Sequence, residues 1–354
     1  MSDVPVSDVP VGDVPVSDVL VAGGGPIGLA TALHVHAAGL TVTVVEPRQG
    51  PMDKACGEGL MPGAVRLLAE LGVNPLGQDV HGIRYRDGDR TAEAPFRNGL
   101  GRGVRRTELQ RALRATVDEH AIPVVCGTVT DIVQDRHGVR ACGLSARYLV
   151  AADGLHSGVR RSMNLVRNTD PSARRWGQRR HFEMAPWTNY IEVHWGAASE
   201  AYVTPVGDGL VGVAILSSHR TPFDEQLRDF PDLIERISDA TGSRVMGAGP
   251  LRQTASRRVA GRVLLVGDAA GYVDALTGDG IAVGLDSGRR LAQCLAEDRP
   301  DRYESEWRRS SRRYRAITGS LLRATAIPRV RGTIVPLAER MPALFQGVVR
   351  QLSG

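Results

Sequence analysis

The alternation of apolar and polar residues changes abruptly close to the start of the chain. Residues 1–17 repeat a five-residue unit, SDVPV, SDVPV and GDVPV, in which prolines block helix formation and recurring charges leave no face to bury. From Asp18 onward come an apolar run at 19–22, a glycine turn, a helical stretch over 26–38 and an apolar run at 41–46. We therefore expect a disordered extension over 1–17, followed by a strand–helix–strand unit.

Helical spacing of Leu, Val and Ala returns later in the chain. It predicts helices over 63–72 and 107–119, and again over 280–297 and 301–325. Beyond residue 325 the chain is apolar and basic and is punctuated by prolines. We expect this last segment to pack across one face of the protein.

Strand patterns fall into two groups. The runs at 147–152 and 262–267 are short and apolar, and they end in Asp-Gly and Gly-Asp. Between about 178 and 218 the residues are rich in aromatic and β-branched types, with a turn signal at 207–209. The first group belongs with the opening unit, and the second predicts a separate sheet that binds substrate.

Length and composition place the chain among soluble globular proteins. At 354 residues it exceeds the usual size of one hydrophobic core, which favours two closely packed domains. The hydrophobic fraction of 42% and the charged fraction of 23% are ordinary, and no apolar run is long enough to span a membrane. Neither a secretion signal nor a disulfide framework is evident, so we expect a cytoplasmic protein.

The charge is positive but dispersed. The net charge is +5, and Lys54 is the single lysine among 44 basic residues, so arginines supply the rest. They are scattered along the chain and are not interleaved with aromatic residues, so we expect no nucleic-acid partner. Positive charge also attracts the phosphates of dinucleotide cofactors.

The glycine turn after the first strand carries the first chemical signal. Residues 23–28 read GGGPIG, in which Gly23 permits the tight turn, Gly25 leaves room for a pyrophosphate and Gly28 lets helix and strand pack closely. The amides that open the following helix suit an anionic phosphate. Glu46, at the end of the second strand, is placed to accept hydrogen bonds from a ribose. This pattern predicts dinucleotide binding without choosing FAD or NAD.

Two later motifs resemble those of a known superfamily. Residues 149–160, LVAADGLHSGVR, look like the Asp-Gly motif of the FAD-dependent aromatic hydroxylases, and residues 263–271 look like their Gly-Asp motif. The resemblance implies that Asp268 holds the ribityl chain of FAD and that Asp153 organises the loop near the pyrophosphate. An NAD dehydrogenase with one cofactor has no use for both motifs. The alternative for each aspartate is an ordinary turn at the end of a strand.

Finer features are more similar to the geranylgeranyl-reductase branch of the same superfamily. These are residues 54–60, KACGEGL, and the stretch from Gly267 through residues 277–281, TGDGI. Phenol hydroxylases typically carry His and Pro in the second stretch, and this chain does not. Asp279 departs from the reductase branch, which commonly has Glu there.

The TGDGI stretch also has a physical meaning. It precedes a predicted helix whose N-terminal amides would face the pyrimidine edge of a flavin. A positive dipole end there favours the anionic reduced flavin, which is the form that donates hydride or reacts with dioxygen.

The residues expected to bind FAD combine the glycine turn with the positions implied by the resemblance. For Arg106, which lies at a strand-to-helix junction, the alternative is a solvated side chain. The full set is Gly23, Gly25, Pro26, Ile27, Gly28, Glu46, Pro47, Arg48, Lys54, Cys56, Gly57, Arg106, Val129, Asp153, Gly154, Gly267, Asp268, Gly278, Gly280 and Ile281.

The resemblance implies an α/β fold in which a Rossmann-type FAD-binding domain is interleaved with a mainly β substrate domain and is followed by C-terminal helices. The FAD-binding domain would comprise residues 18–80, 100–170 and 255–297. The substrate domain would comprise 81–99 and 171–254, and the C-terminal helical segment 298–354.

Alternation along the substrate strands gives the catalytic candidates. His181 and Glu183 share one face of a strand, as do Glu192 and His194 on the next, and Tyr202 lies on the one after. The alternative is that these residues form the solvated face of a half-buried sheet.

Cysteines and aromatic residues offer further clues about the site. Cys56 is a candidate because its loop would border the flavin ring, the alternative being an inert buried thiol. The other cysteines, Cys126, Cys142 and Cys294, lack metal spacing, so we expect no metal. Aromatic residues concentrated at 176–195 favour an apolar substrate, although core packing would enrich them equally.

These patterns lead to a functional hypothesis and two alternatives. The favoured reading is an FAD-dependent monooxygenase that uses NADPH or NADH and O2 to hydroxylate or epoxidise an apolar aromatic, polyketide or isoprenoid compound. The first alternative is a reductase of prenyl double bonds. The second is a lipid carrier at the membrane surface, indicated by the apolar and arginine-rich stretch 321–349, although its prolines break any long amphipathic helix.

Overall fold

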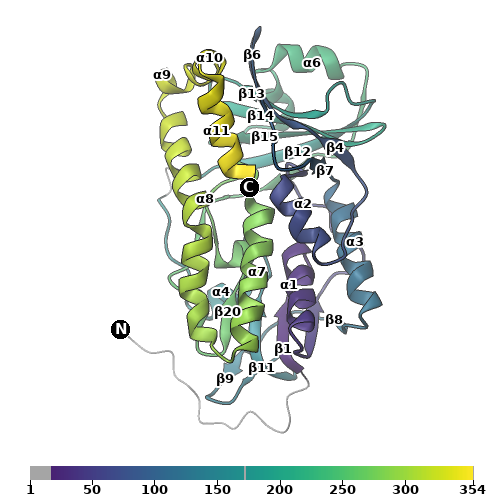
Figure 1. Ribbon diagram of the computed structural model, residues 1–354, viewed down its shortest axis with the longest axis vertical. Coiled ribbons are helices and arrows are strands. Elements are labelled where there is room, and N and C mark those ends of the chain that lie inside the picture. The colour runs from purple at the N-terminus through teal and green to yellow at the C-terminus, as the bar shows by residue number, and fades with distance from the viewer. Residues whose placement is uncertain (1–16, 171–172, 354) are drawn as a thin grey trace.

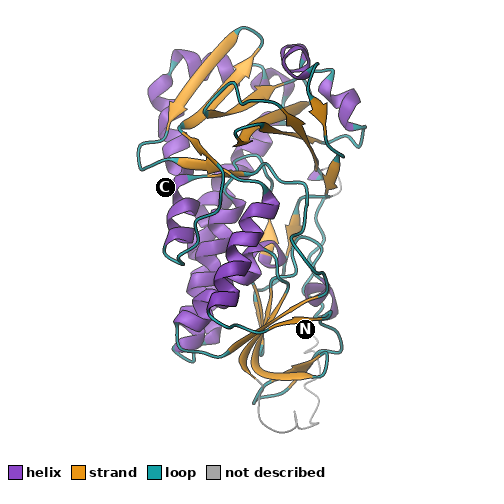
Figure 2. Cartoon of the chain, turned by 90° about the vertical axis from the view of Figure 1, so that its right-hand side faces the viewer, coloured by secondary structure: helices purple, strands orange, loops and turns teal. Residues whose placement is uncertain are grey.

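A computed structural model describes residues 17–170 and 173–353 of the chain. The predicted disordered extension lies outside the described residues, apart from Ser17, which is the first residue of β1 (Ser17–Ala22). The remaining chain forms two large sheets, one at each end of an elongated molecule, with long helices running beside the first (Figures 1 and 2). This architecture confirms the predicted α/β fold class.

The first sheet is largely parallel. β1 lies at its centre, paired in parallel with β2 and β11, because the apolar run at 19–22 is buried on both faces and reads as a continuous hydrophobic strand. Its path, in spatial order, is β19 (Val259–Ala260), β20 (Val263–Leu265), β11 (Leu144–Ala151), β1, β2 (Val42–Glu46) and β8 (Val124–Cys126), and β9 (Val133–Gln134) and β10 (Val139–Ala141) extend it beside β11.

Helices cover this sheet and bring the cofactor motifs together. α1 (Pro26–Ala37) packs between α3 (Arg106–Glu119) and α7 (Gly280–Ala296), and α7 packs in turn against α8 (Tyr303–Thr325) (Figure 1). These four agree closely with the predicted helices. The helix predicted over 63–72 is present as the shorter α2 (Pro62–Ala69), which also contacts α7.

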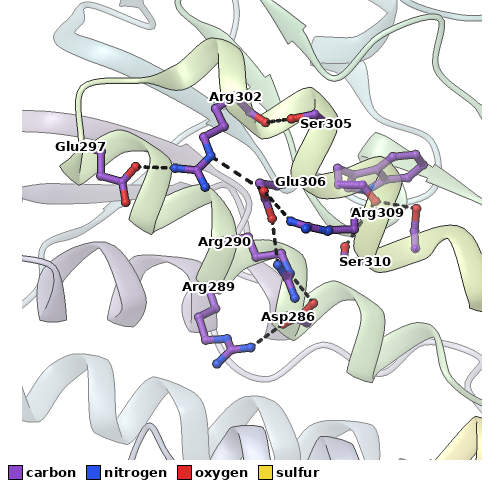
Figure 3. A network of polar contacts seen from close by, with 11 residues as sticks. Asp286, Arg289, Arg290, Glu297, Arg302, Ser305, Glu306, Arg309 and Ser310 are labelled. Carbon is purple, nitrogen blue, oxygen red and sulfur yellow. Dashed lines mark hydrogen bonds and ion pairs between the residues drawn. The ribbon is translucent and has the colours of Figure 1, made fainter.

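Ion pairs join α7 to α8 on the outside of the molecule. Arg290 donates to Asp286 on its own helix at 2.7 Å and to Glu306 on α8 at 2.9 Å (Figure 3). Arg302, in the short 3-10 helix η3 (Pro300–Arg302) between them, contacts Glu297 at 3.0 Å. Such exposed pairs contribute little each, so the buried apolar contacts carry most of this packing.

The second sheet is mostly antiparallel and is strongly twisted. In spatial order its path is β16 (Thr241–Gly242), β12 (Trp176–Glu183), β15 (Leu210–Ser217), β14 (Ser199–Gly207), β13 (Tyr190–Trp195), β5 (Gly82–Asp87) and β6 (Arg90–Pro95), and β17 (Met246–Ala248) pairs with β12. One face packs on α5 (Phe223–Leu227) and α6 (Pro231–Ile237). The other face looks toward the first sheet (Figure 2).

Smaller elements lie between the two sheets. A three-stranded sheet of β3 (Gly59–Leu60), β7 (Gly101–Gly103) and β4 (Gln78–Val80) connects them, and β18 (Gln253–Thr254) pairs with β21 (Gly271–Tyr272). The Asp-Gly motif continues into α4 (Gly158–Ser162), and the Gly-Asp motif forms the 3-10 helix η2 (Gly267–Ala270).

The C-terminal segment forms three short helices. α9 (Pro328–Arg331) packs against α8, and α10 (Ile334–Arg340) and α11 (Pro342–Ser353) lie beside the second sheet at β6 (Figure 1). None of the helices in the described ranges is both long and apolar enough to cross a bilayer. The domain boundaries stay a prediction.

We expect Gly103→Ala to destabilise the fold by about 2 kcal/mol or more, because overpacking at a rigid contact has no cheap relief. A Cβ at Gly103 on β7 would lie 1.7 Å from the carbonyl oxygen of Pro205 on β14, where the two sheets meet. Gly319→Ala in α8 is the matched control, since a Cβ there meets nothing within 4 Å and Ala favours helix. Thermal unfolding of both variants checks this, and equal midpoints would contradict it.

Candidate active site

Two hollows meet at the carboxyl end of β2. One is a cavity of about 490 Å³ between the two sheets, and the other is a groove of about 540 Å³ that runs along α3. Glu46 and Arg48 line both. Ligands of open α/β sheets bind at this edge, beyond the carboxyl ends of the strands.

The glycine turn brings backbone close to backbone. Gly23 has φ of +108°, which is a conformation that L side chains rarely adopt, and a Cβ there would lie 2.7 Å from the carbonyl oxygen of Ala152. A Cβ at Gly28 would lie only 1.9 Å from the carbonyl oxygen of Gly23. α1 therefore starts directly beside β1, with Pro26 at its first position and its first-turn amides free to meet a phosphate.

Glu46 is held as an ionised acceptor beside this turn. Its Oε2 accepts a hydrogen bond from the Gly24 amide at 2.7 Å, and its Oε1 accepts from Arg48 Nε at 2.8 Å. Burial opposes ionisation, but these hydrogen bonds outweigh it and lower the pKa of Glu46. A carboxylate with spare lone pairs in this position suits the hydroxyls of an adenosine ribose.

Charged groups gather where the pyrophosphate and ribityl chain of FAD would lie. Burial raises the pKa of Asp268, although Arg106 and Lys54 nearby partly offset this. Burial lowers the pKa of Lys54, and Arg48 and Arg106 lower it further by repulsion. The side chains of Arg48, Lys54 and Arg106 and the carboxyl of Asp268 therefore surround the same part of the cavity.

Unpartnered polar atoms test whether FAD fits. Arg106 Nε and Asp153 Oδ1 are buried without a hydrogen-bond partner, although both residues line the cavity. Such orphaned groups are costly unless a ligand satisfies them. Together with the bare backbone at Gly25, where the nearest atom to a Cβ would be Arg106 Nη2 at 4.0 Å, they fit a phosphate-bearing, hydroxyl-rich cofactor.

Arg160 joins the Asp-Gly and Gly-Asp motifs. Its buried guanidinium donates to the carbonyl of Ala269 at 2.9 Å and of Asp268 at 3.1 Å, and on the other side to the carbonyl of Leu155 at 2.7 Å. The two loops are thus fixed relative to one another. The sequence showed this arginine within the motif but gave it no role.

Most of the residues expected to bind FAD line the cavity. Four do not: Gly28 packs against Gly23, Gly267 packs against Ile27, Val129 packs on the core of the first sheet, and Pro47 lies outside both hollows. Those that line it are Gly23, Gly25, Pro26, Ile27, Glu46, Arg48, Lys54, Cys56, Gly57, Arg106, Asp153, Gly154, Asp268, Gly278, Gly280 and Ile281.

Glu58 is a site residue that the sequence reasoning missed. It is buried, lines the cavity and has φ of +58°, and its Oε1 accepts a hydrogen bond from the Arg106 amide at 2.9 Å. Its Oε2 lies 2.6 Å from His181 Nε2. The left-handed backbone at Glu58 cannot be read from the sequence, so only its place within the KACGEGL segment indicated a role.

His181 is therefore a supporting residue and does not line the cavity. Its side chain lies on the face of β12 that looks toward the first sheet. Glu58 Oε2 contacts one side of its ring, however, and Arg179 Nη1 lies 2.9 Å from Nδ1 on the other side. Arg179 is in turn paired with Asp53. This buried chain fixes the loop of residues 53–58 against the substrate sheet.

Glu183 and His194 do not face the cavity either. Glu183 is exposed near the end of β12, as the alternative of a solvated residue predicts. His194 is buried with Glu192 on the opposite face of the sheet. Burial opposes the ionisation of Glu192, but hydrogen bonds from His194, Arg84 and Trp187 outweigh it and lower the pKa of Glu192 to about 2. That face is covered by α5 and α6, so the expectation that it is solvated was wrong there.

Tyr202 and Cys56 do line the cavity. The Tyr202 hydroxyl donates to the carbonyl of Leu276 at 2.9 Å. Burial raises the pKa of the Cys56 thiol despite the opposing charge of Arg106, so the thiol stays protonated at neutral pH. Its Sγ lies 3.4 Å from the Glu58 amide.

The substrate end of the cavity is apolar. The predicted aromatic cluster at 176–195 does not line it; Trp195, for example, packs edge-on against Tyr85 instead. The walls are aliphatic side chains and tyrosines from the second sheet, from β21, from two loops and from α11, namely Ile83, Tyr85, Ile191, Val193, Tyr202, Ala214, Leu216, Leu251, Tyr272, Leu276 and Val349. In the described ranges no cluster of His, Cys, Asp or Glu side chains has the composition to hold a metal.

Asp279 is buried at the start of α7, between cavity-lining residues. Its Oδ1 has no partner, and burial raises its pKa to about 8, with a hydrogen bond from Thr277 as the opposing influence. In the sequence, this aspartate stands out only as a departure from the reductase branch.

We expect Arg106→Met to weaken FAD binding about tenfold or more, because it removes charge-assisted hydrogen bonds to the cofactor. Arg313→Met, on the exposed face of α8, is the matched control and should bind FAD as the unchanged protein does. Titration of apoprotein with FAD, followed by quenching of flavin fluorescence, measures both. Equal affinities for the two variants would contradict the assignment.

Asp279 also predicts a pH dependence of stability. The folded chain keeps a proton on Asp279 up to about pH 8, whereas the unfolded chain loses it near its ordinary pKa of 3.8. The free energy of unfolding therefore falls as pH rises between these values, by at most about 1.4 kcal/mol per pH unit. Asp279→Asn should remove this loss. The difference between the thermal midpoints of the variant and the parent protein should therefore shift in favour of the variant as pH rises from 5 to 8. Asp301→Asn, at an exposed carboxyl, should show no such trend.

Comparisons with known proteins identify the family of the chain. The family described as FAD binding domain matches residues 16–306. Menaquinone reductase of Mycolicibacterium smegmatis is 30% identical, covering 94% of this chain and 90% of its own. Digeranylgeranylglycerophospholipid reductase 2 of Methanosphaera stadtmanae is 26% identical over 76% of this chain and 75% of its own.

Solved structures show the same fold. A flavin-dependent brominase superposes with a TM-score of 0.81 at 18% identity, covering 95% of this chain and 93% of that one. A geranylgeranyl bacteriochlorophyll reductase-like protein of Thermoplasma acidophilum gives 0.77 at 21% identity, covering 91% of each chain. From the glycine turn, the joined Asp-Gly and Gly-Asp loops and these matches, the chain belongs to the FAD binding domain family and is an FAD-dependent oxidoreductase.

Proposed function

We propose that the protein is a reductase that saturates a carbon–carbon double bond of an isoprenoid lipid or a prenylated quinone. The carrying observation is the aliphatic cavity that adjoins the FAD-binding residues. An alkene needs no ionising base in its pocket, and apolar walls bind an isoprenoid chain through burial alone. The curated relatives named above, a menaquinone reductase and a digeranylgeranylglycerophospholipid reductase, support the same substrate class.

The placement of the basic side chains favours this proposal over phenol hydroxylation. A hydroxylase usually has a group that helps to ionise the phenol. His181 is engaged by Glu58 and Arg179, and His194 lies on the far face of the sheet. Among the described residues, the apolar walls of the cavity therefore offer hydroxyl donors, and the one imidazole that lines it is that of His156 in the Asp-Gly loop.

Reduction of a double bond requires a hydride on one carbon and a proton on the other. FAD, when bound and reduced by NADH or NADPH, would supply the hydride. Burial raises the pKa of Tyr85 to about 12 and that of Tyr272 well above its ordinary value, so both phenols stay protonated beside the substrate. Both tyrosines line the cavity and neither hydroxyl makes a hydrogen bond within the described residues, so either can donate the proton.

The second candidate is the monooxygenase predicted from the sequence. The apolar walls favour it too, because a dry pocket protects an oxygenated flavin from water. Such a reaction would consume NAD(P)H and O2 together. The two candidates differ in one requirement, since the reductase needs no oxygen.

One experiment separates them. The FAD-loaded protein, reduced with NADH or NADPH, is incubated with menaquinone or a geranylgeranyl lipid without oxygen, and in parallel under ¹⁸O₂. We expect a product two hydrogens heavier without oxygen, detected by mass spectrometry, and no ¹⁸O in the product under oxygen. Heat-inactivated protein is the control.

The opposite pattern would overturn the proposal. An ¹⁸O-labelled product formed only in air would establish the monooxygenase. Rapid reoxidation of the flavin with no change in any substrate would exclude both lipids as substrates.

A further inference from the structure

Exposed apolar side chains gather on the C-terminal helices. Of the ten large apolar residues that the described chain leaves exposed, five lie between residues 327 and 344. Clusters of this kind mark contact surfaces, whereas single exposed residues are ordinary. The five are Ile327, Val330, Leu337, Met341 and Leu344, and we call them the apolar patch.

Exposed basic residues are interspersed along the chain with the apolar patch. Arg323, Arg329, Arg340 and Arg350 are exposed in the same stretch, and Glu339 is the single acidic residue between 321 and 353. Val330, Leu337 and Leu344 lie on α9, α10 and α11 respectively, and Ile327 and Met341 directly precede α9 and α11. Apolar residues bordered by arginines are typical of surfaces that lie on anionic membranes.

The inner face of the same helices closes the cavity. Val335, Ala338, Phe345 and Val349 are buried against β5, β6 and β13. The Phe345 ring lies 4.5 Å, centroid to centroid, from that of Tyr85, and Tyr85 and Val349 both line the cavity. One short segment thus carries the apolar patch outside and a wall of the substrate site inside.

Prolines divide this segment into α9, α10 and α11, so it cannot form one long amphipathic helix. The division does not remove the pattern, because α10 and α11 each pack apolar residues on the sheet and α9 is held there by Arg331, which pairs with Glu200 at 2.9 Å. The segment is therefore a bent cover over the cavity. Its cationic border also opposes pairing with a second copy of the same patch.

We propose that α9–α11 dock the protein on an anionic lipid bilayer and bring the cavity next to the acyl region. A long isoprenoid can then enter from the membrane without exposing its chain to water. The identity of the substrate in this inference rests on the proposed function. The binding partner, which is the bilayer surface itself, does not.

Vesicle binding tests the docking surface directly. The FAD-loaded protein is sedimented with vesicles of phosphatidylcholine alone or of phosphatidylcholine with 30% phosphatidylglycerol, at low and high salt. We expect binding to the anionic vesicles, reduced by salt, and little binding to the neutral ones. Equal binding to both, or to neither, would overturn the proposal, as would elution of the lipid-free protein as a dimer that masks the patch.

Matched variants locate the surface. Leu337→Ser combined with Leu344→Ser, and separately Arg329→Gln combined with Arg340→Gln, should each lower vesicle affinity about tenfold. The controls are Leu76→Ser combined with Ile234→Ser, and Arg312→Gln combined with Arg313→Gln, at exposed positions elsewhere. The controls should bind like the parent, and a loss equal to that of the patch variants would contradict the assignment. FAD content and thermal midpoint confirm that every variant is folded.

Turnover separates this inference from the proposed function. If the reductase proposal holds, the patch variants should lose activity on a lipid embedded in anionic vesicles but keep it on a short, water-soluble prenyl alcohol. Vesicle binding without any reductase activity would leave the docking surface standing and reject the proposed reaction. Full activity of the patch variants on the embedded lipid would reject delivery from the membrane.

Discussion

The structure depends on the close approach of three backbone segments at the start of the fold. β1, the first turn of α1 and the end of β11 meet where Gly23 and Gly28 leave no room for a Cβ. Because no side chain separates them, the amides of α1 and the loop after β11 face the same small volume, and the positive end of the helix can stabilise an anionic phosphate there. The remaining site residues are arranged around this contact: Glu46 through its bond to the Gly24 amide, and Arg160 by fixing the loop that carries Asp268.

Local chemistry explains why the fold and the cofactor site were predictable from the sequence. The glycine turn and the two aspartate motifs depend on neighbours within a few residues, and Glu46 ends the next strand of the same strand–helix–strand unit, so spacing alone indicates their geometry. The apolar run of β1 and the helical spacing of α3 and α7 are equally local. The elements they predict are present in the structure, with ends that differ by a few residues.

The substrate side could not be predicted because it depends on contacts between distant segments. Alternation on β13 separates Glu192 and His194 from Ile191 and Val193, but it does not say which set α5 and α6 cover. Glu58 and His181 meet across more than a hundred residues, and the left-handed backbone at Glu58 leaves no signal in the sequence. The same holds for Val349, whose place in the cavity wall follows only from the folded arrangement.

The cover formed by α9–α11 gives the molecule two levels of stability. These helices contact the outer strands β5 and β6 of the second sheet, whereas the FAD-binding loops are held by α1, α7 and the first sheet. Most contacts of α10 and α11 are with β5, β6 and β13, so the cover can separate from the sheet at a lower free energy than global unfolding requires. Amide hydrogens of α10 and α11 would then exchange with solvent faster than those of α7, and a bulky product could leave the cavity while the cofactor stays bound.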